Sequence, residues 1–552
     1  MMRCCIHWQK NMILKRHNLN LFSIIIIAFS TIAKAQVTLL NTYQNSVSTT
    51  IGDFHGITYR EGGFSSLHYI PNTNGTEFWT VTDRGVNIDA SNANKGATPS
   101  SKYPTCIPTY DKIYAFPTYS PKIMRLKIVG SEVQVLQMIT IKRPNGSDAS
   151  GIINPTDFGS TAVEVASTNV VSDCANFDAN TVPKDIWGID SEGLDIDADG
   201  NFWICDEGGP TIWKLSATGV VLKRYSPYAL TQSEDVAINN CFSYRRNNRG
   251  FEGITVAPSG KIYAIIQSPM YYKNVSGVGA SGSLENSRIH RILEIDPATN
   301  IQKMYAYVND GAIGTSSDIR PSDFKIGDIK AINNTTFLVI EQGARGAQNI
   351  KRMYQIDITN ATEVMSGIVY NSKTLEELEI PSNLTTSGIV PVTKTLLFDL
   401  HASGWPTSIE KAEEIAIIDA NTIVLVNDND FGQYCPTENG IGIANNVNCT
   451  LYKFSLSGSN ALGNYIPNNN IVLSNTDVFE VNKKLKAYPN PFINEINLEN
   501  LQNNDTFYTI TNILGQQVAK GEIVNNIINL EKLKSGIYHL KINNTREKII
   551  KQ

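Results

Sequence analysis

The chain has 552 residues, 41% of them hydrophobic and 18% charged, with 47 Lys and Arg against 52 Asp and Glu. A formal net charge of −5 argues against nucleic acid as a partner, because a nucleic-acid-binding face needs a surplus of basic side chains. The hydrophobic content is sufficient for a folded core and excludes wholesale disorder. At about 100–200 residues per domain, the length allows several domains.

The first 35 residues have the parts of a secretory signal peptide. Basic residues precede an apolar run over residues 21–29, and Ala33-Lys34-Ala35 supplies a cleavage sequence before Gln36. The apolar run is shorter than the about 20 residues of a membrane-spanning helix, and a retained anchor is the alternative. We expect residues 1–35 to be removed, leaving an exported chain with no transmembrane segment.

Between residues 50 and 456 the sequence repeats a strand–turn–strand pattern. The same spacing joins four pairs of positions, which are Glu192 and Asp206, Glu252 and Ile266, Gly327 and Glu341, and Glu413 and Asn427. A fifth hairpin, from Phe54-His55-Gly56-Ile57 to Thr82-Asp83-Arg84, carries an insertion. A second alternating hairpin such as TIWKLSATGVVLKRY follows each of them, so every unit has four strands.

Four strands repeated in this way are typical of a β-propeller blade. The predicted fold is therefore all-β, with a β-propeller of five to seven blades over residues 36–456. Five units are evident, and the irregular stretches at 87–120, 145–190 and 366–410 have room for another, so we favour six. A pair of β-sandwiches is the alternative, but it does not predict the constant spacing.

The hairpins bring acidic side chains together. The first residue of one strand lies beside the last residue of its antiparallel partner, so these positions meet on one face of a propeller, around its channel. Such a group of carboxylates needs raised pKa values or a bound cation, and oxygen ligands favour Ca²⁺ or Mg²⁺ over zinc. For any single Asp, an Asx turn is the alternative. The predicted metal ligands are Glu192, Asp206, Glu207, Glu252, Asp328, Glu341, Glu413, Asp428 and Asp430, with His55 and Asp83 on the same rim.

Three arginines flank this rim, namely Arg84 in TDRG, Arg249 in NNRGFEG and Arg345 in EQGARG. Guanidinium groups bind phosphate and carboxylate bidentately, so these side chains are candidates for holding an anionic substrate. Ion pairing with the acidic rim is the alternative. The chain has no convincing G-x-S-x-G sequence, which argues against a Ser-His-Asp hydrolase.

Removal of the signal peptide leaves six cysteines, none of them in a CxxC pair, so a zinc site is not expected. Export to an oxidising compartment favours disulfides. Cys435 and Cys449 close a short loop and are predicted to pair. For the other four, several pairings are open, and we favour Cys106–Cys174 and Cys205–Cys241.

Several motifs follow one another in this part of the chain: DSEGLDIDADGNFWICDEGGPTIWKLSATGVVLKRY, NRGFEGITVAPSGKIYAIIQSPM, RILEIDP and AEEIAIIDANTIVLVNDNDFG. In this order they resemble the family called esterase-like activity of phytase, over roughly residues 50–456. The resemblance implies a propeller rich in Glu and Asp whose proposed activity is phosphoester hydrolysis. The chain departs from the pattern at Gly327-Asp328 and at His55-Gly56. The family's motif positions fall on Glu192, Glu252, Asp206, Glu207, Asp428 and Asp430.

The C-terminal residues 486–552 form a separate unit after an Asn- and Ser-rich linker at 457–485. The motifs YPNPF, NILGQQVAKG and LKSGIYHLKI occur here in order and resemble the type A sorting domain of the type IX secretion system of Bacteroidetes. The resemblance implies a small β-sandwich that engages the secretion machinery and is then removed or attached to the cell surface. An ordinary accessory β-sandwich is the alternative.

Together these features predict a secreted phosphoester hydrolase that depends on a divalent metal, with Ca²⁺ the expected ion and a small phosphoester or ester the expected substrate. Glu192, Glu252 and Asp206 are the candidate ligands or general bases, and Arg84 and Arg249 are the candidates for binding phosphate oxygens. The alternative is a propeller that Ca²⁺ stabilises and that binds a ligand or protein at the cell surface without catalysis.

Overall fold

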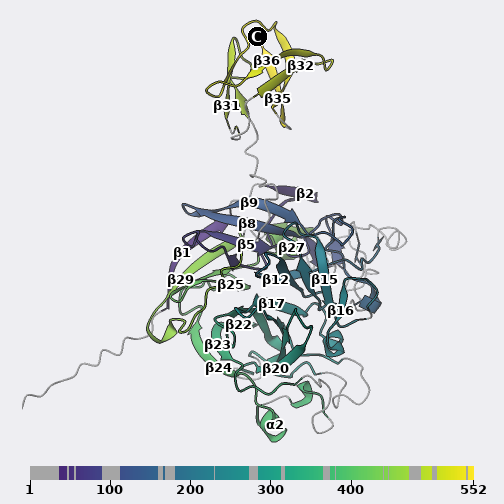
Figure 1. Ribbon diagram of the computed structural model, residues 1–552, viewed down its shortest axis with the longest axis vertical. Coiled ribbons are helices and arrows are strands. Elements are labelled where there is room, and N and C mark those ends of the chain that lie inside the picture. The colour runs from purple at the N-terminus through teal and green to yellow at the C-terminus, as the bar shows by residue number, and fades with distance from the viewer. Residues whose placement is uncertain are drawn as a thin grey trace, which may run out of the picture.

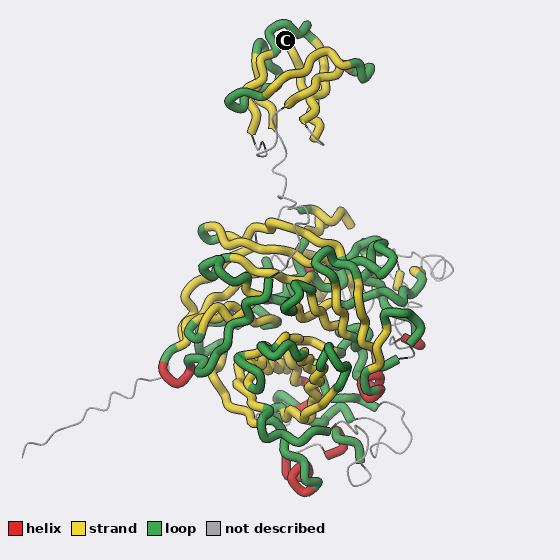
Figure 2. The backbone as a smooth tube through the Cα atoms, viewed as in Figure 1, coloured by secondary structure: helices red, strands yellow, loops and turns green. Residues whose placement is uncertain are grey.

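The computed structural model describes the chain in segments separated by short gaps. These segments are 37–45, 49–54, 57–89, 112–158, 166–167, 181–228, 230–272, 284–311, 318–364, 373–378, 381–438, 441–444, 447–471, 486–499, 501, 507–542 and 545–552. Their regular structure is almost entirely β-strand, as Figure 2 shows, with short 3-10 turns and one six-residue helix, α2 (Pro381–Thr386). No helix in these segments has the length and apolar character of a membrane span.

Five antiparallel blades of four strands each make up the larger unit (Figure 1). The first blade is β4 (His68–Tyr69), β5 (Glu77–Val81), β8 (Lys122–Val129) and β9 (Glu132–Thr140), and the second is β12 (Ser191–Ile196), β13 (Phe202–Asp206), β14 (Ile212–Leu215) and β15 (Val221–Ser226), extended by β16 (Asp235–Ala237). The third is β17 (Phe251–Val256), β18 (Ile262–Ile266), β19 (Ile289–Ile295) and β20 (Gln302–Val308). The fourth is β21 (Phe324–Ala331), β22 (Thr336–Arg345), β23 (Gln348–Asp357) and β24 (Thr393–Asp399), and the fifth is β25 (Glu414–Asp419), β26 (Thr422–Val426), β29 (Thr450–Leu456) and β1 (Val37–Asn45).

The inner strands β4, β12, β17, β21 and β25 contact one another in this order and close a ring, since β25 also contacts β4. The fold is therefore a β-propeller, as predicted, and its five blades lie within the expected range but are one fewer than the favoured six. The described parts of the irregular stretches add no blade to this ring. Parts of two of them form a small separate sheet of β6 (Asn87–Asp89), β7 (Lys112–Tyr114), β10 (Ala166–Ser167) and β11 (Thr181–Val182), and the third contributes α2 and β24.

The N-terminal strand β1 is the outermost strand of the last blade. It pairs antiparallel with β29, with Val37 opposite Leu456, and it also pairs in parallel with β9 of the first blade. Apolar side chains fill the spaces between blades. For example, Trp79 packs edge-on against Phe202 at a ring separation of 5.3 Å, across the contact between the first two blades.

The first blade differs from the predicted alignment at its inner strand. Phe64 pairs with Thr82 and His68 pairs with Trp79, so the segment that begins at Glu61 is the partner of β5. The predicted partner around Phe54 instead belongs to a separate hairpin of β2 (Thr50–Phe54) and β3 (Ile57–Arg60). His55 lies outside the described residues. The sequence Glu61-Gly62-Gly63 is the Glu-Gly signal that the prediction overlooked.

The predicted disulfides are wrong where the structure describes the cysteines, because Cys205, Cys241 and Cys449 are buried free thiols. The Cys205 sulfur accepts a hydrogen bond from the Gly193 backbone at 3.2 Å. The Cys241 sulfur lies 3.9 Å from the sulfur of Met304, so each thiol has a different neighbour, and the Cys205–Cys241 bond is not formed. Cys449 likewise donates to Asn429 at 3.1 Å and does not pair with Cys435. Cys106 and Cys174 lie outside the described residues.

After β29, residues 464–470 cross the end of the channel at which the inner strands finish. Asn468 donates to Asp195 at 3.1 Å, Asn470 donates to the carbonyl of Ile196 at 2.9 Å, and Tyr465 donates to the carbonyl of Ile417 at 3.2 Å. This segment therefore contacts β12 and β25, and it lines a cavity of about 30 Å³ at this end of the channel.

The C-terminal unit consists of two small sheets, as Figure 1 shows in yellow. One contains β30 (Lys486–Tyr488), β31 (Glu495–Glu499) and β34 (Ile527–Asn529). The other contains β33 (Gln517–Glu522), β32 (Phe507–Asn512), β35 (Gly536–Ile542) and β36 (Thr545–Lys551). The two sheets share one apolar core, which includes Phe492, Ile496 and Leu540, so the predicted β-sandwich is confirmed.

Candidate functional site

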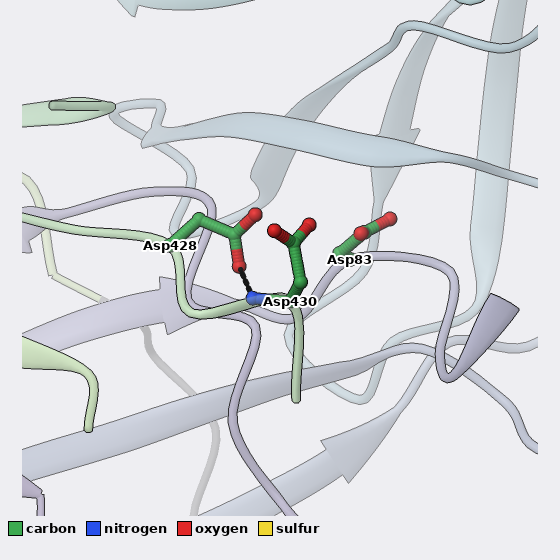
Figure 3. Close-up of side chains that lie close together, drawn as sticks. All are labelled: Asp83, Asp428 and Asp430. Carbon is green, nitrogen blue, oxygen red and sulfur yellow. Dashed lines mark hydrogen bonds between the residues drawn. The ribbon is translucent and has the colours of Figure 1, made fainter. Parts of the chain in front are cut away.

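Five carboxylates gather where the inner strands begin, and we call them the acidic centre: Asp83, Asp190, Glu192, Asp428 and Asp430. One oxygen from each of Asp83, Asp428 and Asp430 lies within 4.8 Å of the other two, and the same holds for Asp83, Asp190 and Glu192. Asp83 thus belongs to both groups of three. Asp430 lies between Asp428 and Asp83, and its backbone donates to Asp428 at 2.8 Å (Figure 3).

The Glu-Gly motif positions the glutamates of the second and third blades. The strand register shifts between Ser191 and Leu194 and again between Phe251 and Gly253, so Glu192 and Glu252 both lie at β-bulges. A bulge leaves one residue unpaired and changes the direction of its side chain.

The glycine of the same motif is needed because neighbouring inner strands touch. A Cβ atom on Gly193 would lie 2.7 Å from the backbone nitrogen of Ile254, and one on Gly253 would lie 2.5 Å from that of Ile329. Each motif therefore supplies one carboxylate for the channel and one close contact between blades.

In the fourth and fifth blades carboxylates occupy the glycine position. Asp328 and Glu414 form a hydrogen bond with each other, and Asp328 also accepts from the backbone of Ile415 at 2.9 Å. Burial raises the pKa of Asp328 to about 7, although Lys330 opposes the shift. These two side chains form a second buried pair that is separate from the acidic centre.

Two basic side chains partly neutralise the acidic centre. The Lys411 ammonium lies 2.5 Å from Asp428 and 2.7 Å from Asp430. Arg84 lies 3.0 Å from Asp190, and both side chains are almost fully buried. The Asp430 side chain is 49% exposed, and Lys411 lowers its pKa.

Asp83, Glu192 and Asp428 nevertheless keep raised pKa values. Burial and the neighbouring Asp190 raise the pKa of Asp83 well above its usual value. Burial and the charges of Glu252 and Asp83 also raise the pKa of Glu192 well above its usual value. Burial and the charge of Asp430 raise the pKa of Asp428 in the same way, although Lys411 opposes this shift. A group of buried acids that resist ionisation in this way would be stabilised by a further cation.

Glu207 and Glu252 lie side by side next to the acidic centre. The Gln267 amide donates to both, at 2.7 Å in each case, and Asn248 donates to Glu207 at 2.9 Å. Burial raises the pKa of Glu207 to about 7 and raises that of Glu252 well above its usual value, with the Glu207 charge adding to the second shift.

The remaining predicted ligands do not join the groups of three. Asp206 accepts from Thr211 at 2.8 Å and from two backbone nitrogens, and burial raises its pKa to about 6. Glu341 lies 2.5 Å from the ammonium of Lys394 and accepts from Tyr307. The bulge in β21 places Ile326, not Asp328, opposite Glu341. Glu413 is buried, 5% exposed, and stands two residues after Lys411.

The three predicted arginines also have different interaction partners. Arg84 pairs with the acidic rim, which is the alternative considered for it, and Arg345 forms a two-point ion pair with Asp323. Arg249 donates to Ser268 at 3.0 Å. The prediction overlooked Asp190 and Lys411, which stand one residue before the Ser191-Glu192 and Ala412-Glu413 segments, so proximity to the motif was the available signal.

The fold and the acidic centre define a β-propeller protein with a buried carboxylate cluster at its channel. A family model described as esterase-like activity of phytase matches residues 60–431, and the chain belongs to this family. A second model, the secretion system C-terminal sorting domain, matches residues 486–552. The protein is therefore a propeller protein that is secreted or attached to the cell surface, and its tail implies the secretion machinery as a partner.

Individual relatives are more distant. An uncharacterized secreted protein of Arthroderma benhamiae is 34% identical over 107 residues, which cover 15% of this chain and 20% of the relative. Among solved structures, PorZ of Porphyromonas gingivalis is 9% identical with a TM-score of 0.27, over 91% of this chain and 61% of that one. The PQQ-bound aldose sugar dehydrogenase of Streptomyces coelicolor is 10% identical with a TM-score of 0.32, over 77% of this chain and 99% of that one.

Proposed function

We propose that this protein is a secreted phosphoester hydrolase whose acidic centre binds a divalent cation, most suitably Ca²⁺. The observation that carries the proposal is the pair of three-carboxylate groups that share Asp83. All donors in these groups are carboxylate oxygens, a set that suits Ca²⁺ or Mg²⁺ and does not suit zinc or copper. Asp83, Asp428 and Asp430 would hold one ion. Asp190 and Glu192, together with Asp83, form the second group. Such an ion supplies positive charge that neutralises and orients a phosphate group.

The chain's own residues offer the other functions that the reaction needs. A general base works best when its pKa lies near the working pH, and Glu207 meets this condition because burial raises its pKa to about 7. Among the residues predicted as general bases, Glu252 shares the Gln267 amide with Glu207, whereas Asp206 is held by Thr211 and the backbone. Glu207 is therefore the better candidate for the general base, and Glu252 lies beside it.

Arg249 is the better of the two predicted phosphate-binding arginines. Its guanidinium donates to the hydroxyl of Ser268 and lines an open pocket of about 330 Å³, whereas Arg84 is paired with Asp190. We therefore assign phosphate binding to Arg249 and charge compensation within the acidic centre to Arg84.

The second candidate function is a binding module without catalysis, stabilised by Ca²⁺. Lys411 and Arg84 favour it, because side chains that already neutralise part of the acidic centre are also what a structural cluster requires. Propellers serve many unrelated functions, so the fold does not choose between the two.

The decisive experiment measures hydrolysis and ion binding on the same sample. The mature protein would be assayed with Ca²⁺ on a phosphomonoester and a phosphodiester, beside Glu192→Gln and a sample treated with chelator. We expect turnover that falls at least about tenfold in the variant and in chelator. No turnover above Glu192→Gln would exclude the hydrolase. A rise in melting temperature with Ca²⁺ in that case would identify the binding module.

A further inference from the structure

A basic pocket of about 330 Å³ adjoins the acidic centre, and the third, fourth and fifth blades provide its walls. Seven Arg and Lys side chains line it against four Asp and Glu side chains. Its size falls at the lower end of the range for small-molecule sites, which is about 300–1,000 Å³. An excess of positive charge around a pocket of this size favours an anion.

Among the described residues, three of these basic side chains form no ion pair with the acids around them. Arg345 pairs with Asp323, and Arg246 lies 3.3 Å from Glu285. Within the described part of the chain, no carboxylate lies within ion-pair distance of Arg249, Lys325 or Lys351. Arg249 donates to a hydroxyl, and Lys351 donates to the side-chain oxygens of Asn349 and Gln342, at 3.1 and 3.4 Å, and to the carbonyl of Glu410.

The pKa values in the pocket are consistent with missing negative charge. Burial, with Arg246 nearby, lowers the pKa of Arg249 to about 10, although the charges of Glu207, Glu252 and Asp323 oppose the shift. Burial likewise lowers the pKa of Lys351 to about 8 despite the charges of Glu413 and Glu410, so the acids present do not restore the usual values. Both groups would gain from an anion, since an opposite charge favours the protonated form of a base.

Lys411 stands between the pocket and the acidic centre. It lines the pocket, while its ammonium lies 2.5 Å from Asp428 and 2.7 Å from Asp430. These two carboxylates also belong to one of the groups that could hold a metal ion. A divalent cation and the Lys411 ammonium therefore compete for the same two carboxylates.

We propose that the basic pocket is a binding site for an oxyanion such as phosphate or sulfate, and that Lys411 couples it to the acidic centre. A cation bound by Asp428 and Asp430 displaces the ammonium, which then adds its charge to the pocket. The anion site extends the phosphate binding proposed for Arg249 and does not need a metal ion, whereas the coupling rests on the proposed metal site. Because linkage is reciprocal, a bound anion also strengthens cation binding.

Calorimetry on the mature chain tests both parts, with sodium sulfate as the anion probe and CaCl₂ as the cation probe at constant ionic strength. We expect Ca²⁺ to tighten sulfate binding at least about fivefold in the native protein, a size typical of coupled sites. Lys325→Met should weaken sulfate binding about tenfold and keep the Ca²⁺ effect. Lys411→Met should bind Ca²⁺ more tightly than the native protein and lose the Ca²⁺ effect on sulfate.

Each contrary result has a definite meaning. Unchanged sulfate binding in Lys325→Met overturns the anion site. A Ca²⁺ effect that persists in Lys411→Met shows that the added charge acts through space, and it overturns the coupling. If the native protein binds no Ca²⁺, the metal site and the coupling both fail, while the Lys325→Met result still decides the anion site. Melting curves confirm folding, and Lys411→Gln replaces Lys411→Met if the latter does not fold.

Discussion

Replacing Glu207 with Gln should remove a specific pH dependence from the stability of the propeller. Burial raises the pKa of Glu207 from 4.5 to about 7, and this side chain is only 6% exposed. Between these two pH values the folded protein holds a proton that the unfolded chain has released. The free energy of unfolding must therefore fall as the pH rises through this window, which is opposite to the usual effect of a carboxylate in an ion pair.

The size of the effect follows from the same two values. The interval from 4.5 to about 7, at about 1.4 kcal/mol per pH unit, corresponds to at most about 3 kcal/mol. Glutamine resembles the protonated acid. Between pH 4.5 and 8 the free energy of unfolding of Glu207→Gln should therefore fall by about 3 kcal/mol less than that of the native protein. Denaturant unfolding without divalent cations provides the measurement. Tryptophan fluorescence reports the propeller alone, because every tryptophan of the mature chain precedes residue 456.

Glu132→Gln serves as the control, since Glu132 is exposed at the start of β9 and should leave the pH profile of the native protein unchanged. The same decline with pH in Glu207→Gln as in the native protein would refute the assignment of this proton to Glu207. A native protein whose stability rises between pH 5 and 8 would refute the wider inference that its buried acids keep raised pKa values.

Three further results are expected. Gly253→Ala should destabilise the propeller by about 3 kcal/mol in the same unfolding assay, because its Cβ would lie 2.5 Å from the backbone nitrogen of Ile329. The control, Gly463→Ala, places its Cβ in open space and should change the stability little, so equal effects of the two variants would contradict the close contact. Arg84→Met should cost about 3–5 kcal/mol at pH 8 and less as the pH falls, because the raised pKa of Asp190 lets it take up a proton; a loss independent of pH would contradict the ion pair. Alkylation of the unfolded, unreduced protein followed by mass spectrometry should label the thiols of Cys205, Cys241 and Cys449. Protection of any of these three thiols from alkylation would contradict the structure.

The blades could be predicted because their signals are local. Two alternating strands and a tight turn have a fixed length, so the spacing from Glu192 to Asp206 recurs from blade to blade. The two ends of the third hairpin do meet, because Gln267, next to Ile266, donates to Glu252 at 2.7 Å. The prediction from spacing failed for the first blade, since the insertion conceals which segment pairs with β5.

Much of the site could not be predicted because it depends on register and on contacts between blades. A bulge changes which face a side chain occupies, so Asp328 and Glu341 point to different neighbours although they belong to one hairpin. The partner of Asp428 is Lys411, which comes before the hairpin and carries no motif of its own. The thiols of Cys205 and Cys241 lie in one apolar core, but their different neighbours are set by the tertiary fold.

The pairing of β1 with β29 has a consequence for how the propeller folds. Val37 lies opposite Leu456, so the ring cannot close until nearly the whole propeller sequence is available. Contacts of such long sequence separation slow folding, because the entropy of the intervening chain is lost before the contact forms. A chain that lacks residues 37–45 would leave β29 as an unpaired edge, and an exposed edge strand promotes aggregation. The last blade is thus complete only when both ends of the propeller sequence are present.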